Sequence, residues 1–163
     1  MTFDLKSRPN KLPWPPLIFL ATSAIAVLLQ LLFPVPWGMT GWIVWIGWTL
    51  IVGGLGLDVW AMLTMARAHT NILPNRAADR LVEAGPFAFT RNPIYLGNTL
   101  VMIGVGVVWN SLWFAGFAVV AAALVQRLAI VREEAHLALL FGDQWSAYAA
   151  RVPRWIAVVR PGS

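Results

Sequence analysis

Long apolar runs constrain the fold of this chain more than any other feature. There are four of them, at residues 17–33, 42–65, 94–109 and 112–128. Hydrophobic residues make up 59% of the sequence and charged residues only 12%, about half the charge content of soluble domains. A perpendicular membrane crossing needs about 20 apolar residues. We therefore predict an all-α integral membrane protein, a single domain over residues 1–163, with about four transmembrane helices.

The two short connections between these runs, at 34–41 and 109–112, carry no charge. Positive residues lie instead in the N-terminal tail, in the 67–93 loop and after residue 131. The positive-inside rule then places both termini and the long loop in the cytoplasm. The first run lacks a small-x-small cleavage site at its end, so we expect a retained anchor and not a signal peptide. The last two runs, separated only by Asn110-Ser111, predict a helical hairpin.

Composition also excludes several kinds of site. The chain has no cysteine, which excludes disulfides, thiolate zinc sites and a cysteine nucleophile. The net charge of +5 sits beside apolar spans, which favours contact with membrane lipids over nucleic acid. Gly53-Gly54-x-Gly56 and Gly104-x-Gly106 fit close helix packing better than a nucleotide fingerprint. We predict neither a metal site nor a Rossmann-type cofactor site.

Asn92-Pro93 predicts the start of the third membrane helix. Asparagine is a good N-cap, and proline is favoured at the first helical position. The unpaired N–H groups of such a helix end attract anions. The alternative is a plain turn before a membrane helix.

Glu133-Glu134 follows the fourth run by a few residues. We expect the pair on a helix that continues out of the bilayer, because Leu137, Leu140 and Phe141 keep an apolar period after it. A carboxylate there could bind a cation or ribose hydroxyls, and the alternative is a solvated helix face.

Two other titratable residues stand out. Asp58 lies inside the second run, where a carboxylate usually faces a partner or a wet cavity. It could pair with Arg67 or Arg91, or line a site. His69, at the end of that run, could be a general base or a solvated side chain.

Together these polar segments resemble the integral-membrane methyltransferases typified by isoprenylcysteine carboxyl methyltransferase, whose relatives include the phospholipid methyltransferases. The resemblance covers about residues 65–155. Its motifs are His69-Thr70-Asn71-Ile72-x-Pro74, Leu81-Val82, Gly85-Pro86-Phe87, Arg91-Asn92-Pro93-x-Tyr95-x-Gly97, Glu133-Glu134-x-x-Leu137, Phe141-Gly142 and Tyr148-x-x-Arg151-Val152-Pro153.

The resemblance implies a cytoplasmic pocket for S-adenosylmethionine. The helix start would meet the methionyl carboxylate, two aromatic rings would hold the adenine, and Glu133 would accept hydrogen bonds from the amino group or ribose. The implied cofactor-binding residues are Leu81, Val82, Gly85, Phe87, Arg91, Asn92, Pro93, Ile94, Tyr95 and Glu133. Arg127 and Tyr148 are the candidates for substrate binding.

Two departures from the carboxyl methyltransferases bear on the substrate. Asn92 stands where they have histidine, and Ala129 stands where they carry a substrate arginine. We therefore expect a methyltransferase for a lipophilic acceptor from the bilayer, such as a lipid amine, with Asp58, His69 and Glu134 as candidate bases. A prenylcysteine-type carboxyl methyltransferase is the alternative. A non-catalytic transporter or assembly subunit is the alternative of another class.

Overall fold

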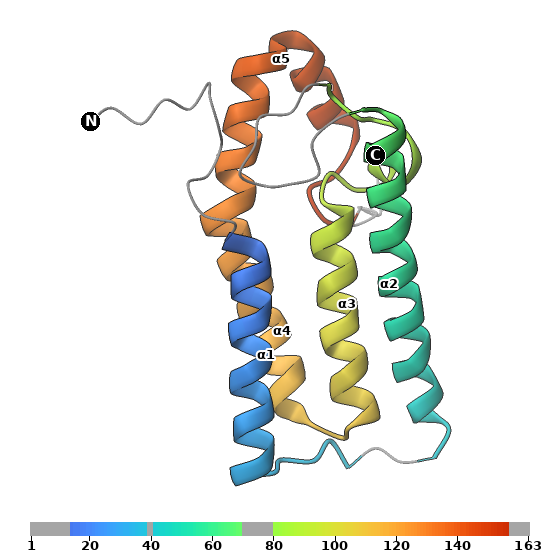
Figure 1. Cartoon of the computed structure of the whole chain (residues 1–163), viewed down its shortest axis with the longest axis vertical. Coiled ribbons are helices and arrows are strands. Elements are labelled where there is room, and N and C mark those ends of the chain that lie inside the picture. The colour runs from blue at the N-terminus through green and yellow to red at the C-terminus, as the bar shows by residue number, and fades with distance from the viewer. Residues whose placement is uncertain (1–13, 39–40, 70–79, 157–163) are drawn as a thin grey trace, which may run out of the picture.

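Seven helical elements make up the part of the chain described by the computed structural model, which is residues 14–38, 41–69 and 80–156 (Figure 1). Helix α3 begins at a proline, which is favoured at the first helical position. The helices continue through apolar runs because their interiors are free of proline. The elements are α1 (Trp14–Leu32), α2 (Ile43–Arg67), the 3₁₀ helix η1 (Gly85–Ala88), α3 (Pro93–Val108), α4 (Leu112–Val125), the π-helical turn η2 (Gln126–Ile130) and α5 (Val131–Arg151).

The predicted all-α membrane fold is confirmed. By length and composition, α1, α2 and the continuous helix Leu112–Arg151 could each cross a membrane. The remaining apolar helix, α3, has 16 residues and a length of about 24 Å, a little short of the roughly 30 Å hydrocarbon core. It forms the predicted hairpin with α4.

In the bundle α3 lies between α4 and α2, and α1 packs against α4 (Figure 1). Alanines let α1 and α4 approach closely, since Ala26, Ala118 and Ala121 are fully buried. The same apolar cluster extends to Val125, Ala129 and Ile130 at the end nearest α5.

Glycines set the distance between α2 and α3. A Cβ on Gly54 would lie 2.6 Å from the carbonyl oxygen of Gly97, and one on Gly104 would lie 2.6 Å from that of Gly47. The expectation that the glycine runs serve helix packing is therefore confirmed for Gly54 and Gly104. Gly53 and Gly56 of the same run face open space.

The α3–α4 turn is closed by a helix-ending motif with a left-handed residue. Asn110 has φ 51°, its N–H donates to Val107 O, and the Ser111 N–H donates to Gly106 O at 2.7 Å. Asn110 Oδ1 also accepts the Trp37 N–H at 2.9 Å. Both short connections therefore meet at one end of the bundle.

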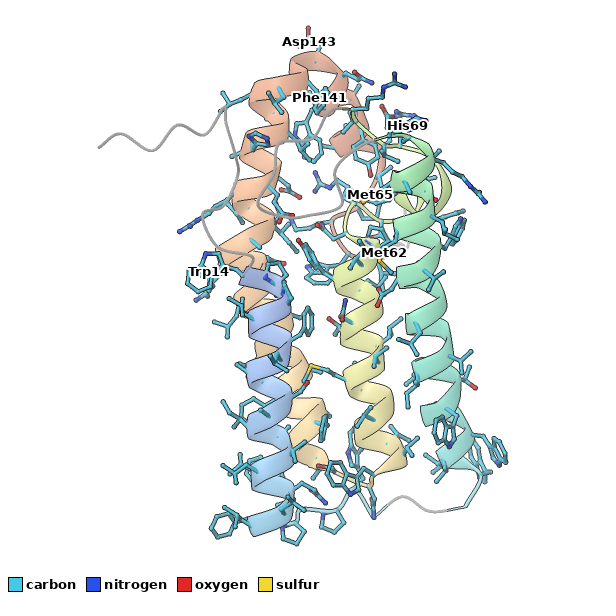
Figure 2. The ribbon with its side chains drawn as sticks, viewed as in Figure 1. Trp14, Met62, Met65, His69, Phe141 and Asp143 are labelled. Atoms are coloured by element: carbon cyan, nitrogen blue, oxygen red, sulfur yellow. The ribbon has the colours of Figure 1, made fainter. Side chains whose placement is uncertain are left out.

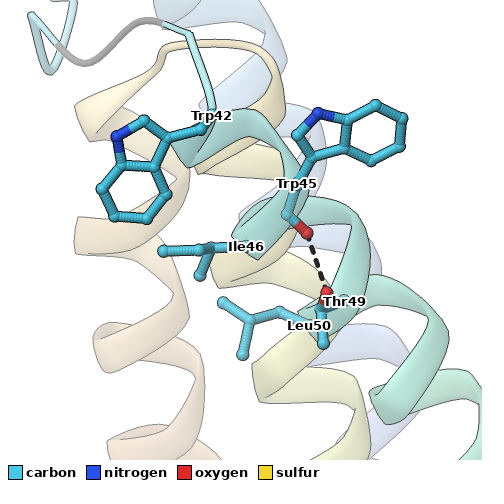
Figure 3. A pocket seen from close by; sticks show the side chains of 5 residues that line it. All are labelled: Trp42, Trp45, Ile46, Thr49 and Leu50. Atoms are coloured by element: carbon cyan, nitrogen blue, oxygen red, sulfur yellow. Dashed lines mark hydrogen bonds between the residues drawn. The ribbon is translucent and has the colours of Figure 1, made fainter.

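That end also carries a shallow groove of about 330 Å³ on α2 alone. Trp42 and Trp45 line it, 71% and 74% exposed, above Ile46, Thr49 and Leu50 (Figure 3). Exposed tryptophans at a helix end are typical of a membrane interface.

At the opposite end the fourth apolar run ends at residue 128, but the helix that begins with α4 continues beyond it. It runs through η2 into α5, so that Glu133 and Glu134 lie on a continuing helix as predicted. At Gly142 the backbone has φ 49° and ψ −118°, and residues 143–151 form a return leg that folds back towards the start of α3 (Figure 1). This reversal builds the candidate site.

Candidate active site

The start of α3 is the centre of the site. The helix begins at Pro93, as predicted, with Asn92 in the N-cap position. The expectation that the Asn92 side chain caps the helix is wrong, because it forms no capping hydrogen bond with the first turn of α3; Asn92 Nδ2 instead donates to Arg154 O at 2.9 Å. Asn92 is buried, and its own N–H donates to Thr90 Oγ1 at 3.2 Å. The side chain is thus used to hold another segment of the chain.

Tyr95, on the first turn of α3, reaches across to α5. Its hydroxyl donates to Glu133 at 2.9 Å from Oε1 and 3.1 Å from Oε2. Glu133 lies beyond the apolar part of the long helix, which ends at Val131. Burial raises the pKa of Glu133 to about 7; the hydrogen bond from Tyr95 opposes this shift, and the charge of Glu134 adds to it. Two predicted cofactor residues therefore meet.

Glu134 faces two arginines. Arg154 Nε donates to Glu134 Oε1 at 2.9 Å and Nη2 donates to Oε2, while Arg91 Nη2 lies 3.4 Å from Oε1. The side chains of Arg91 and Glu134 are only 14% and 15% exposed. The bidentate pair that Glu134 forms with Arg154, whose side chain is 36% exposed, fixes geometry as well as charge.

The residues after α5, 152–156, cross the start of α3, and we call them the strap. They are not helical, and residues 157–163 lie outside the described part. The Arg91 N–H donates to Pro153 O at 2.9 Å, and Trp155 Nε1 donates to Gln126 Oε1 at 2.7 Å.

The return leg of α5 packs against the segment that precedes α3. The hydroxyl of Tyr148 donates to Phe87 O at 2.8 Å, and burial raises its pKa well above the usual value, so it stays a neutral donor. Leu81 packs on the cluster of Trp145, Tyr148 and Val152. The guanidinium of Arg91 lies 5.6 Å from the centre of the Trp145 ring.

Asp58 lies away from this group. Its Oδ1 is buried without a hydrogen-bond partner, and a Cβ on Gly97 would lie 2.0 Å from it. Gly97 and Tyr95 are two residues apart, about 200° around α3, so Asp58 and Glu133 contact opposite faces of that helix. Within the described residues Asp58 forms an ion pair with neither Arg67 nor Arg91.

The other predicted residues lie around the site without a direct role in its contacts. His69 lies in the turn after α2, has φ 50° and is exposed (Figure 2), and Arg127 is exposed on η2. Val82, Gly85 and Ile94 are half-buried in the loop and the first turn of α3. The Thr70-Asn71-Ile72-x-Pro74 part of the first motif lies outside the described residues.

Sequence reasoning missed Thr90, Trp145, Arg154 and Trp155. A glycine near the end of a helical pattern is a signal for a helix end, and Gly142 gave that signal. The partners of the segment that follows depend on the direction of the turn. The sequence does not specify that direction.

Ala129, the position of interest for the substrate, is fully buried in the main apolar cluster, which Tyr95 and Trp155 also contact. No cationic group is therefore contributed from this position.

Comparison with known proteins relates this geometry to a family. A family model described as phospholipid methyltransferase matches residues 42–144. Protein-S-isoprenylcysteine O-methyltransferase B of Arabidopsis thaliana is 32% identical over 121 residues, covering 72% of this chain and 61% of that protein. The nickel-cobalt-cadmium resistance protein NccN of Alcaligenes xylosoxydans xylosoxydans is 32% identical over 111 residues, covering 67% of this chain and 50% of that protein.

Among solved structures, the fold is similar to a eukaryotic intramembrane Ras methyltransferase, an isoprenylcysteine carboxyl methyltransferase. The TM-score is 0.64 at 25% identity, over 92% of this chain and 54% of that one. The chain thus spans about half to three fifths of the length of these relatives. The resemblance found in the sequence is confirmed: this integral membrane protein belongs to the phospholipid methyltransferase family.

Proposed function

We propose that this chain transfers a methyl group from S-adenosylmethionine to a lipophilic acceptor that arrives from the bilayer. The observation that carries the proposal is the Tyr95–Glu133 contact at the start of α3, in a member of this family. It joins a helix end suited to an anion with a carboxylate suited to an amino group or to hydroxyls.

The donor groups at this helix end fit the cofactor. Arg91 Nε is buried without a hydrogen-bond partner, and such a donor is costly to bury unless something accepts its hydrogen. The methionyl carboxylate would satisfy it together with the N–H groups of the first turn of α3. Glu133 would accept from the amino group or ribose, and Phe87 with Tyr95 would border the adenine.

Bound there, S-adenosylmethionine would supply a methyl carbon activated by its sulfonium. The chain has to orient donor and acceptor and exclude water. The buried contacts of Tyr95, Arg91 and the strap serve orientation, and the aromatic side chain of Trp155 serves exclusion.

A neutral amine of a lipid, or a similar small lipophilic nucleophile, is the acceptor that we propose. Ala129, buried in the apolar cluster, supplies no cation to meet a substrate carboxylate. An ammonium must first lose its proton. Of the candidate bases, Glu134 is held by two arginines. Asp58, on the opposite face of α3 from Glu133, and the exposed His69 are the two that we keep for that role.

A prenylcysteine carboxylate is the second candidate. It is favoured by the similarity to the Arabidopsis thaliana protein-S-isoprenylcysteine O-methyltransferase. Arg91 is a cation at the site that could meet such a carboxylate, although its Nη2 already lies 3.4 Å from Glu134. We propose no metal-binding role from the similarity to the metal-resistance protein. Among the described residues there is no group of three metal-ligating side chains.

One experiment separates these candidates. The purified protein is incubated with labelled S-adenosylmethionine, phosphatidylethanolamine and a synthetic prenylcysteine. Label on the lipid amine, with a rate that rises with pH as the amine loses its proton, is the expected result. A base-labile methyl ester on the prenylcysteine alone, with a nearly flat profile above about pH 6, contradicts the amine assignment. Absence of S-adenosylhomocysteine binding contradicts the enzyme itself.

A further inference from the structure

Both carboxylate oxygens of Glu134 are occupied. Arg154 takes one with Nε and the other with Nη2, and Arg91 lies against the first. The side chain is largely buried. Each oxygen of Glu134 already accepts a hydrogen bond from an arginine, so we look for its role in what these arginines hold.

What Glu134 holds is the strap. Arg154 is its middle residue, and its carbonyl oxygen accepts hydrogen bonds from Asn92 Nδ2 at 2.9 Å and from Thr90 Oγ1 at 3.2 Å. The preceding carbonyl, of Pro153, accepts from the Arg91 N–H. The strap therefore binds the three residues that come directly before α3.

The two neighbouring glutamates thus act on the same helix end by different routes. Glu133 reaches α3 directly through Tyr95. Glu134 reaches it through Arg154 and the strap, which fixes the backbone of Arg91 and the side chain of Asn92. These are the residues proposed to face the carboxylate of the cofactor.

We infer that Glu134 is a positioning residue: it latches the strap across the start of α3, and the latched strap holds Arg91 and Asn92 in place for the cofactor. The inference rests on the proposed function. It assigns to Glu134 a contribution to cofactor affinity without any contact with cofactor or acceptor.

Trypsin reports on the latch directly, because it cleaves after Arg154 and needs that segment undocked. In Glu134→Gln protein, cleavage of the Arg154–Trp155 bond, followed by mass spectrometry, should be about tenfold faster than in the wild type, the scale of one charge-assisted bond. The affinity for S-adenosylhomocysteine should fall by a similar factor. Coupling between two sites is reciprocal, so saturating S-adenosylhomocysteine should slow the cleavage of the wild type.

Glu83→Gln is the matched control, since it breaks another carboxylate–arginine pair, with the exposed Arg151 at 2.7 Å, outside the strap. It should change neither quantity. Glu134→Asp, which keeps the charge, should recover part of both. If Glu134→Gln does not fold, Arg154→Gln tests the latch from the other side and should weaken binding of S-adenosylhomocysteine equally.

Two outcomes overturn the inference. One is unchanged cleavage of the Glu134→Gln protein, and the other is faster cleavage with unchanged affinity. Failure of the proposed function looks different. The wild type then binds no S-adenosylhomocysteine, while the cleavage rates without ligand still decide whether Glu134 latches the strap.

Discussion

The hydroxyl of Tyr95 donates to both carboxylate oxygens of Glu133, at 2.9 and 3.1 Å, and so ties the first turn of α3 to α5. Tyr95 follows the helix start by two residues, and Glu133 follows the end of the apolar part of the long helix by two. The pair therefore stands where the lipid-facing part of the bundle meets its polar end.

Replacing Glu133 with glutamine should weaken binding of S-adenosylhomocysteine by about 10- to 150-fold, the value of a lost charge-assisted hydrogen bond of roughly 1.5–3 kcal/mol. The amide can still accept from Tyr95, so the fold is retained. Calorimetry in detergent measures the change. Asp143→Asn, at the exposed turn of α5 (Figure 2), is the control, and equal small losses in both variants would contradict a contact with the cofactor.

Cofactor binding should depend on pH near neutrality. Burial raises the pKa of Glu133 from its ordinary 4.5 to about 7, so the folded protein loses the negative charge as the pH falls through 7. Affinity for S-adenosylhomocysteine should therefore drop between pH 8 and pH 6. Tyr95→Phe should move this transition upward, because the bond from Tyr95 lowers the pKa. A Glu133→Gln protein with the same pH profile as the wild type would exclude Glu133 as the cause.

Gly142→Ala should weaken cofactor binding without any steric clash. A Cβ at Gly142 has open space, but its φ of 49° and ψ of −118° disfavour any other residue, at a cost of about 1–3 kcal/mol. The return leg and strap should dock less well. Gly116→Ala, also with open space and an ordinary helical φ, should leave affinity and melting temperature nearly unchanged. Two indistinguishable variants would mean that the turn forms equally well with alanine.

Gly54→Ala and Gly104→Ala should each destabilise the bundle by about 1–3 kcal/mol, the usual cost of overpacking. Each new Cβ would lie 2.6 Å from a carbonyl oxygen of the facing helix. Gly53→Ala, on the open face of α2, should be neutral or stabilising by up to about 1 kcal/mol. Thermal unfolding in detergent compares the three, and an equal melting temperature for all of them would contradict the close packing of α2 on α3.

We expect the site on the cytoplasmic side. The natural absence of cysteine allows single-cysteine variants to be labelled with a membrane-impermeant maleimide. Val35→Cys, beside the α3–α4 turn, should react from outside intact cells. Asp143→Cys, at the turn of α5, should react only after the membrane is opened. The reverse pattern would place the site outside the cell.

The sequence was sufficient for the helices and for the start of α3, because apolar run lengths and the Asn92-Pro93 start depend on local chemistry. Through motif spacing it also singled out Tyr95 and Glu133, which lie in contact, while their role towards the cofactor stays a prediction. It was not sufficient for Arg154, whose contact with Glu134 spans a separation of 20 residues and exists only because the chain reverses at Gly142. It also misassigned the Asn92 side chain, which donates to the distant carbonyl oxygen of Arg154 and accepts no hydrogen bond from the backbone N–H groups of the first turn of α3.

The strap has a consequence for how the protein matures. Residues 152–156 are synthesised after α1 to α4, yet they hold the beginning of α3, which was made some sixty residues earlier. A nascent chain can thus insert these four helices in the bilayer before the strap exists. Insertion of the helices and docking of the strap on α3 are therefore separate stages of maturation.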